Sequence, residues 1–258
     1  MHHWSWIGAC ATGSSHMKAG TGCQDAACCL EVPHVGQTAL IAAVSDGAGS
    51  AQFSSIGSRL VIQHFCRRLA RYAINADGKN SQIDELAREW LDEIRDRVSI
   101  LAQERNTVPR EFAATLVAIL VLPQQAFVFH VGDGACVVRK TDGDEWQVPS
   151  WPSNGEYASS TYFVTDDPEP VLRVTTLPGP LNDVAIFSDG LERLALNFSD
   201  KSASSRFFGP MSAPLTTLTG GRGRVLSAQL RDFLNSTQIV ERTDDDKSII
   251  LARRVAAG

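Results

Sequence analysis

The chain has 258 residues, of which 43% are hydrophobic and 21% charged, and its formal net charge is -5. These values are typical of a globular protein with a sizeable core, and they argue against a nucleic-acid partner. We predict a single domain over residues 1–258. The longest apolar run, 112–122, is shorter than the ~20 residues that a membrane span needs, so no membrane partner is expected.

Six cysteines are scattered along the chain without any Cys-x-x-Cys pair, which argues against a structural zinc site. The first residues lack the basic segment and apolar run of a signal peptide. Free thiols are typical of proteins in reducing compartments. We therefore expect reduced cysteines and a cytoplasmic protein.

The first half of the chain predicts three strands and then two helices. Apolar stretches bounded by glycine, proline or polar turns predict buried strands over 4–12, 24–32 and 38–44. Apolar residues then recur at three- to four-residue spacing from Ser54 to about Asn75. The same spacing continues to Leu101 in a second helix, for which Ser81 is the predicted N-cap. The short connection between the two predicts antiparallel neighbours.

The second half returns to strands. A hairpin is expected from 113–122 and 126–131, with 135–139 continuing it after the break at Gly132-Asp133-Gly134. Further strands are expected at 162–165, 171–176 and 184–187, followed by a partly helical region over 191–219, a helix over 226–234 and a last strand over 244–255. Because helices and strands are segregated, we predict an α+β layered domain with mostly antiparallel sheets.

Three acidic positions stand at the ends of predicted buried strands. Asp46 and Asp189 each follow an apolar run in a Ser-Asp-Gly context, and Asp245 lies in an acidic triplet just before the last strand. A buried carboxylate costs free energy unless it is paired, and carboxylate and carbonyl oxygens are the ligands that Mg and Mn prefer. Asp-Gly is also a common turn dipeptide, so residue types alone leave turns and metal ligands as equal alternatives. Asp133, between two glycines, is by itself an ordinary tight turn.

Five motifs together resemble the metal-dependent protein phosphatases of type 2C, the PPM family, and Gly155-Glu156-Tyr157 followed by Thr161-Tyr162-Phe163 is similar to a bacterial branch of it. They stand in the family's order: Gln24-Asp25-Ala26, Ser45-Asp46-Gly47-Ala48-Gly49, Val131-Gly132-Asp133-Gly134, Phe187-Ser188-Asp189-Gly190-Leu191-Glu192 and Asp245-Asp246-Lys247-Ser248. The resemblance covers nearly the whole chain. It implies a four-layer α-β-β-α sandwich, in which two antiparallel sheets are flanked by helix pairs and a metal site lies at one end.

The resemblance also implies roles for single residues. Asp46 would bridge two Mn or Mg ions and Gly47 would offer its carbonyl, while Asp189 and Asp245 would complete the ligand set. Asp25 would orient the attacking water, and Asp133 would bind a weaker third ion. The implied activity is hydrolysis of phosphoserine and phosphothreonine in a phosphoprotein substrate by a two-metal-activated water, with a cognate serine/threonine kinase as a further partner.

Three positions depart from the family pattern. Gln24 stands where a Glu is frequent, Ala48 where eukaryotic members have a His, and Gly20 where those members have a phosphate-binding Arg. Lys18 or His16 could supply that cation, or both could be solvated surface residues. These departures motivate an alternative function, that of a regulatory or phosphoprotein-binding pseudophosphatase with little turnover. The converging acids argue against it, since without a cation they would destabilise the fold.

Other classes of phosphate enzyme lack their motifs here. No cysteine is followed six residues later by Arg, as a cysteine-dependent phosphatase would require. The Gly-x-x-x-x-Gly-Lys-Ser/Thr segment of nucleotide-binding proteins is also missing.

Overall fold

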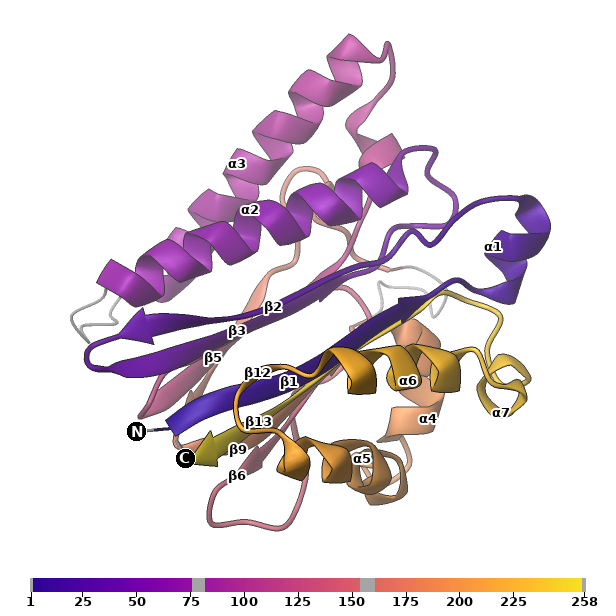
Figure 1. The fold of residues 1–258 in the computed structure, drawn as a ribbon. Helices are drawn as coiled ribbons and strands as arrows, with labels where there is room; N and C mark the ends of the chain where they lie inside the picture. Colours follow the sequence, from indigo (N-terminus) through magenta and orange to yellow (C-terminus); the bar gives the residue numbers. More distant parts are fainter. Residues whose placement is uncertain (1, 76–81, 154–160, 257–258) are drawn as a thin grey trace.

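Two sheets form the centre of this computed structural model, which describes residues 2–75, 82–153 and 161–256 (Figure 1). The six-stranded sheet has the order β12-β1-β13-β9-β6-β7, and the five-stranded sheet has the order β2-β3-β4-β5-β8. Their strands are β1 (His2–Ala11), β2 (Ala26–His34), β3 (Gln37–Ser45), β4 (Leu116–Val121), β5 (Gln125–Val131), β6 (Ala135–Lys140), β7 (Gln147–Ser150), β8 (Arg173–Pro178), β9 (Leu181–Phe187), β12 (Gly221–Arg222) and β13 (Lys247–Ala256).

The strand pairs are antiparallel, apart from the short parallel pair of β1 with β12. A separate two-stranded ribbon joins β10 (Leu196–Asn197) to β11 (Ser202–Ala203). The two large sheets lie face to face in Figure 1. The predicted pair of antiparallel sheets is therefore confirmed.

Helices cover the outer face of each sheet. On the five-stranded sheet lie α2 (Ser54–Asn75) and α3 (Ile83–Glu104), which run in opposite directions (Figure 1). The other sheet carries the remaining long helix, α6, with several short elements. These are α4 (Glu192–Ala195), α5 (Ser205–Ser212), α6 (Arg224–Leu234), α7 (Thr237–Val240) and the 3-10 turns η2 (Asp189–Leu191) and η3 (Ala213–Thr217). Together the layers form the predicted four-layer α-β-β-α sandwich.

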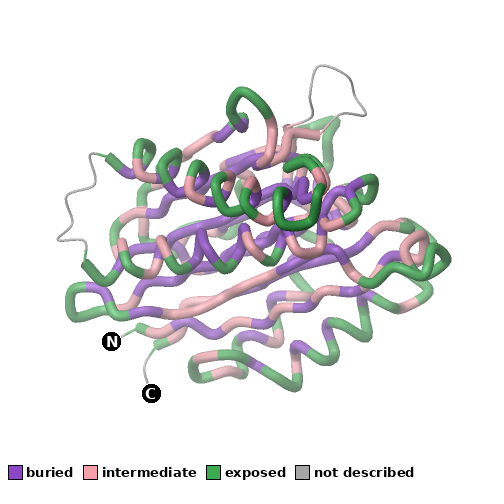
Figure 2. The backbone as a smooth tube through the Cα atoms, turned by 90° about the horizontal axis from the view of Figure 1, so that it is seen from above, coloured by how far each residue is buried: buried purple, intermediate pink, exposed green. Residues whose placement is uncertain are grey.

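Three apolar clusters hold these layers together. One joins α2 and α3 to the five-stranded sheet, with Phe65 contacting Trp90 and Phe129 edge-on. A second joins the six-stranded sheet to α5 and α6, and a third fills the space between the sheets. Figure 2 shows buried residues running along both sheets and exposed residues on the outer sides of the helices. Burial of this apolar surface is the main force that stabilises the sandwich.

Three local expectations and two unanticipated elements need comment. Residues 135–139 do not continue the β4–β5 hairpin, because β6 pairs with β9 and β7 in the other sheet. Residues 162–165 are not a strand, because Asp166 accepts a hydrogen bond from Phe163 N at 2.8 Å and closes a turn there. The helix α1 (Ser14–Ala19) and the 3-10 turn η1 (Pro109–Phe112) were not anticipated. The predicted N-cap Ser81 lies outside the described residues; α3 begins after Gln82.

Within the ranges that the structure describes, none of the helices combines the length and hydrophobicity needed to traverse a lipid bilayer.

Candidate metal centre

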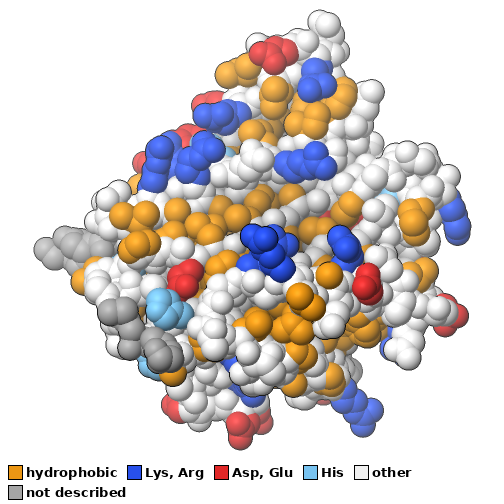
Figure 3. All heavy atoms as spheres, in the orientation of Figure 1, with side chains coloured by type: hydrophobic (Ala, Val, Ile, Leu, Met, Phe, Trp, Pro, Cys, Tyr) orange, Lys and Arg blue, Asp and Glu red, His pale blue; other side chains and the backbone are white. Residues whose placement is uncertain are grey.

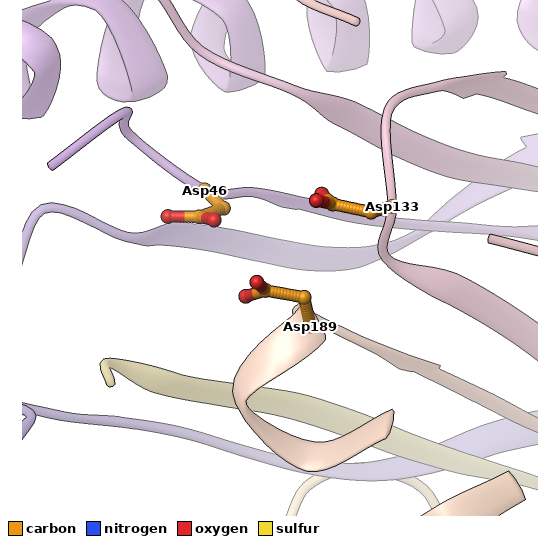
Figure 4. A group of neighbouring side chains, drawn as sticks. All are labelled: Asp46, Asp133 and Asp189. Carbon is orange, nitrogen blue, oxygen red and sulfur yellow. The ribbon is translucent and has the colours of Figure 1, made fainter. Parts of the chain in front are cut away.

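Three aspartates from distant parts of the chain meet at one end of the sandwich. Asp46 follows β3, Asp133 lies in the crossover from β5 to β6, and Asp189 begins η2 directly after β9. One carboxylate oxygen from each lies within 4.8 Å of the others, and the three side chains converge in Figure 4. Asp46 is held in place by Thr115, whose hydroxyl oxygen accepts from Asp46 N at 3.0 Å and whose N–H donates to Asp46 O at 2.8 Å.

Several carboxylate oxygens at this end have no hydrogen-bond donor. Oδ1 of Asp25, Asp133 and Asp189 are all buried without a partner in the described residues. An unpaired buried carboxylate is costly, and hard divalent cations such as Mg and Mn satisfy oxygen ligands of this kind. The donor set therefore fits a divalent metal ion.

Mutual repulsion and burial raise the pKa values of these acids. Burial raises the pKa of Asp189 to about 8, with further contributions from Asp133, Asp245 and Asp25. For Asp46, burial is again the main cause of a pKa well above the usual range, followed by the charges of Asp25 and Asp189. Burial likewise raises the pKa of Asp133. A bound cation would reverse these shifts, because it favours the ionised form.

Asp25 lies beside Asp46 and is buried. Its Oδ2 accepts from the Ser188 hydroxyl at 2.8 Å, and its Oδ1 has no donor in the described residues. Burial raises the pKa of Asp25 to about 6, although the neighbouring polar groups of Asp46, Ser248 and Ser188 oppose that rise. The preceding residue, Gln24, has a buried side-chain oxygen without a partner among the described residues.

Asp245 and Asp246 have different surroundings. The Asp246 carboxylate accepts from Gly13 N and Gln24 N, each at 2.6 Å, so it ties the first strands to the start of β13. The Asp245 carboxylate accepts only from Asp246 N, at 2.8 Å, in the described part of the chain. Asp245 is not one of the three aspartates within 4.8 Å of one another, but its charge raises the pKa values of Asp46, Asp133 and Asp189.

Gly47 stands where backbone segments approach closely. A Cβ there would lie 2.7 Å from the Gln24 carbonyl oxygen and 2.9 Å from the Ser54 backbone. Only glycine fits this space without a shift of the backbone. The residue is also held by an isolated bridge to Ala114. The Asp46-Gly47 turn is therefore fixed by its neighbours rather than free to move.

The two candidate phosphate-binding cations lie on α1 but differ in position. Lys18 is exposed. The His16 Nδ1 atom lies 2.9 Å from Asp246 Oδ2, and its Nε2 would be 3.5 Å from a Cβ on Gly49. His16 therefore lies against the loop that follows Asp46, whereas Lys18 faces solvent.

Several supporting residues were not anticipated from the sequence. Ser188 donates to Asp25 and accepts from Ser248 N at 2.9 Å, and Thr161 donates to Asp133 Oδ2. Lys247 is fully buried, and its Nζ donates to the Asp245 carbonyl at 3.1 Å. The recurrence of Ser before Asp-Gly was a signal for Ser188. The contacts of Thr161 with Asp133 and of Ser188 with Ser248 join residues far apart in sequence and leave no local signal.

Comparisons with known proteins identify the family of this chain. The sequence model of the family described as Protein phosphatase 2C matches residues 12–235. A relative from Escherichia coli (strain K12), Serine/threonine-protein phosphatase 3, is 34% identical over 252 residues, covering 96% of this chain and 98% of the relative.

Solved structures show the same fold. The serine/threonine phosphatase Stp1 from Staphylococcus aureus aligns with a TM-score of 0.63 and 14% identity over 96% of this chain and 94% of that one. The catalytic domain of the serine/threonine protein phosphatase PstP, solved with two manganese ions, aligns with a TM-score of 0.64 and 16% identity over 99% and 100%.

The chain belongs to the protein phosphatase 2C family. Within that class it is a serine/threonine phosphoprotein phosphatase, an enzyme of a metal-dependent family.

Proposed function

We propose that the enzyme hydrolyses phosphoserine and phosphothreonine in proteins with two divalent ions, Mn or Mg, held at the end of the sandwich. The observation that carries this proposal is the convergence of Asp46, Asp133 and Asp189. The Oδ1 atoms of Asp133 and Asp189 are buried and have no donor in the described residues. The related PstP domain was solved with two manganese ions, and this supports the proposal of two ions.

The proposed ligands are those that the resemblance to the family implies. Asp46, one of the three converging aspartates, would contact both ions, with Gly47 offering its carbonyl. Asp189 and Asp245 would complete the set, and Asp133 would hold a weaker third ion. Asp245 is preferred to Asp246 because both Asp246 oxygens already accept backbone N–H groups. Bound divalent ions supply a water nucleophile of lowered pKa and neutralise charge on the phosphoryl oxygens.

The protein's own groups position the reactants. Asp25, fixed by Ser188, would orient the attacking water with its free oxygen Oδ1. His16 would contact the substrate phosphate, because its Nε2 faces the loop after Asp46. In that case His16→Gln raises KM for p-nitrophenyl phosphate and Lys18→Gln does not; equal KM values in the two variants would contradict the role.

The cellular compartment and the partner kinase are also part of the proposal. The six cysteines, all described, form no disulfide, which supports a reducing compartment such as the cytoplasm. A phosphoprotein substrate requires a kinase that forms it, so a cognate serine/threonine kinase is the expected partner.

The test is metal-dependent turnover of a phosphothreonine peptide. Metal-stripped enzyme should be inactive, Mn or Mg should restore activity, and Asp46→Asn and Asp189→Asn should each abolish it. Turnover that survives both substitutions would contradict the metal assignment. Metal binding without turnover in the wild type would instead favour the pseudophosphatase.

A further inference from the structure

A pocket of about 520 Å³ opens between the two sheets, on the side where the short β12 beside β1 ends one sheet and β2 ends the other. Its walls come from β1, β2, β12, α6 and β13, and include the side chains of Trp6 and Ile250. This volume lies in the range of sites that bind small molecules or short peptide segments. The pocket is separate from the three-aspartate cluster, whose residues do not line it.

Three arginines give the pocket its charge. Arg222 on β12 and Arg224 and Arg231 on α6 line it, and none of its lining residues is acidic. Each arginine is exposed, and none has a side-chain ion pair or hydrogen bond within the described residues. Figure 3 shows basic side chains beside hydrophobic ones on this face, above the start of α6. In a chain of net charge -5, such a cluster is a local concentration of positive potential.

The pocket reaches toward the metal centre along β1. Cys10, near the end of that strand, lines it. Cys10 stands opposite Ser248 in the pairing of β1 with β13, and burial together with the charges of Asp25 and Asp246 raises the pKa of its thiol to about 11. One end of the pocket therefore lies near Asp25 and Asp246. Arg222 and Arg224 lie at the other end, where β12 and the start of α6 meet Trp6.

The free edge of β2 runs along the same pocket. Among the described strands β2 pairs only with β3, and its residues Ala27 and Cys29 line the pocket. Ala26, at the start of the strand, directly follows Asp25. An unpaired strand edge accepts an extended peptide through main-chain hydrogen bonds. A peptide lying there would lead from the arginines to the metal centre.

We infer that this pocket, lined by Arg222, Arg224 and Arg231, binds an acidic segment that flanks the phosphorylated residue of the protein substrate. The inference rests on the proposed phosphatase function. Charge complementarity and continuity with the metal centre favour this occupant. It makes the enzyme selective for phosphosites with Asp or Glu on one side, in an extended conformation.

The test compares matched phosphothreonine peptides carrying three Asp residues before the phosphorylated residue, three after it, or Ala at the same positions. One of the two acidic peptides should show kcat/KM about tenfold above the neutral one, mainly through KM. The variant Arg222→Gln/Arg224→Gln/Arg231→Gln should remove this advantage and leave hydrolysis of p-nitrophenyl phosphate unchanged.

A second triple variant controls for net charge. Arg67→Gln/Arg71→Gln/Arg88→Gln removes three exposed arginines from α2 and α3 and should retain the preference. The inference would be overturned if both triple variants lost the preference for the acidic peptide equally, or if the wild type showed no such preference.

Direct binding separates this inference from the proposed function. Fluorescence anisotropy of the labelled acidic phosphopeptide, measured in EDTA, needs no turnover. Binding that is lost only in the pocket variant supports the pocket even if hydrolysis fails. Binding that is equal in the pocket variant and the wild type overturns it even if the enzyme is active.

Discussion

Neutralising Asp189 should stabilise the metal-free protein, because its carboxylate stands among like charges. Its pKa is raised from 3.8 to about 8, first by burial and then by Asp133, Asp245 and Asp25. A carboxyl group with a raised pKa contributes no penalty below pH 3.8 and an increasing one as the pH rises toward 8. At ~1.36 kcal/mol per pH unit, the penalty at pH 7 is about 4 kcal/mol.

Since the neighbouring carboxylates share this repulsion, Asp189→Asn should raise the free energy of unfolding by about 2–4 kcal/mol at pH 7 in EDTA. At pH 5 the gain in the free energy of unfolding should fall to about 1 kcal/mol, because this pH lies only a little above the ordinary pKa of 3.8 at which the penalty begins. Urea unfolding at the two pH values measures both. Asp142→Asn, in the exposed β6–β7 turn, is the matched control and should have little effect.

Manganese should reverse the order of stability, because the wild type then binds the ion and the variant loses a ligand. A metal-free Asp189→Asn protein that is less stable than the wild type at pH 7 would refute the reasoning, since it would mean that the carboxylate is already satisfied.

Two further perturbations test the surroundings of the acids. Gly47→Ala places a Cβ 2.7 Å from a backbone carbonyl oxygen, so we expect it to lower the free energy of unfolding in urea by about 2 kcal/mol. In the control Gly143→Ala the new Cβ meets nothing closer than 3.9 Å, and the free energy of unfolding should hardly change. Equal stability of both variants would contradict the close approach. Asp245→Asn should weaken manganese affinity at least tenfold without loss of stability, whereas Asp246→Asn should lower the free energy of unfolding by about 1–3 kcal/mol, because it disturbs two buried hydrogen bonds. Calorimetry measures the affinity and urea unfolding the stability. If Asp246→Asn weakened manganese binding and Asp245→Asn lowered the stability, Asp246 would be the ligand.

Local patterns were sufficient to predict the strands and helices that carry the aspartates. Asp46 and Asp189 each follow an apolar run that can only be buried, so their positions at strand ends were readable. The sheet to which each strand belongs could not be predicted, because β6 joins the six-stranded sheet by pairing with β9, about 45 residues later. The apolar pattern of residues 162–165 predicted a strand, but the Asp166 carboxylate accepts a hydrogen bond from Phe163 N and a turn forms there.

The details of the site depended on contacts between distant segments. The bonds from Gly13 and Gln24 to Asp246 span more than 200 residues, and they separate a structural acid from its neighbour Asp245. The motif spacing of the resembled family favours Asp245 as the ligand, but no local pattern indicates the hydrogen bonds that Asp246 accepts. The burial of Lys247 and the position of His16 against the Asp46 loop are likewise results of tertiary packing.

The most direct test of the account is calorimetric titration of manganese into metal-free wild type and Asp46→Asn at pH 7. Because Asp46 is expected to contact both ions, the wild type should bind two and the variant should lose both. Unchanged stoichiometry and affinity in Asp46→Asn would contradict the proposed two-metal centre.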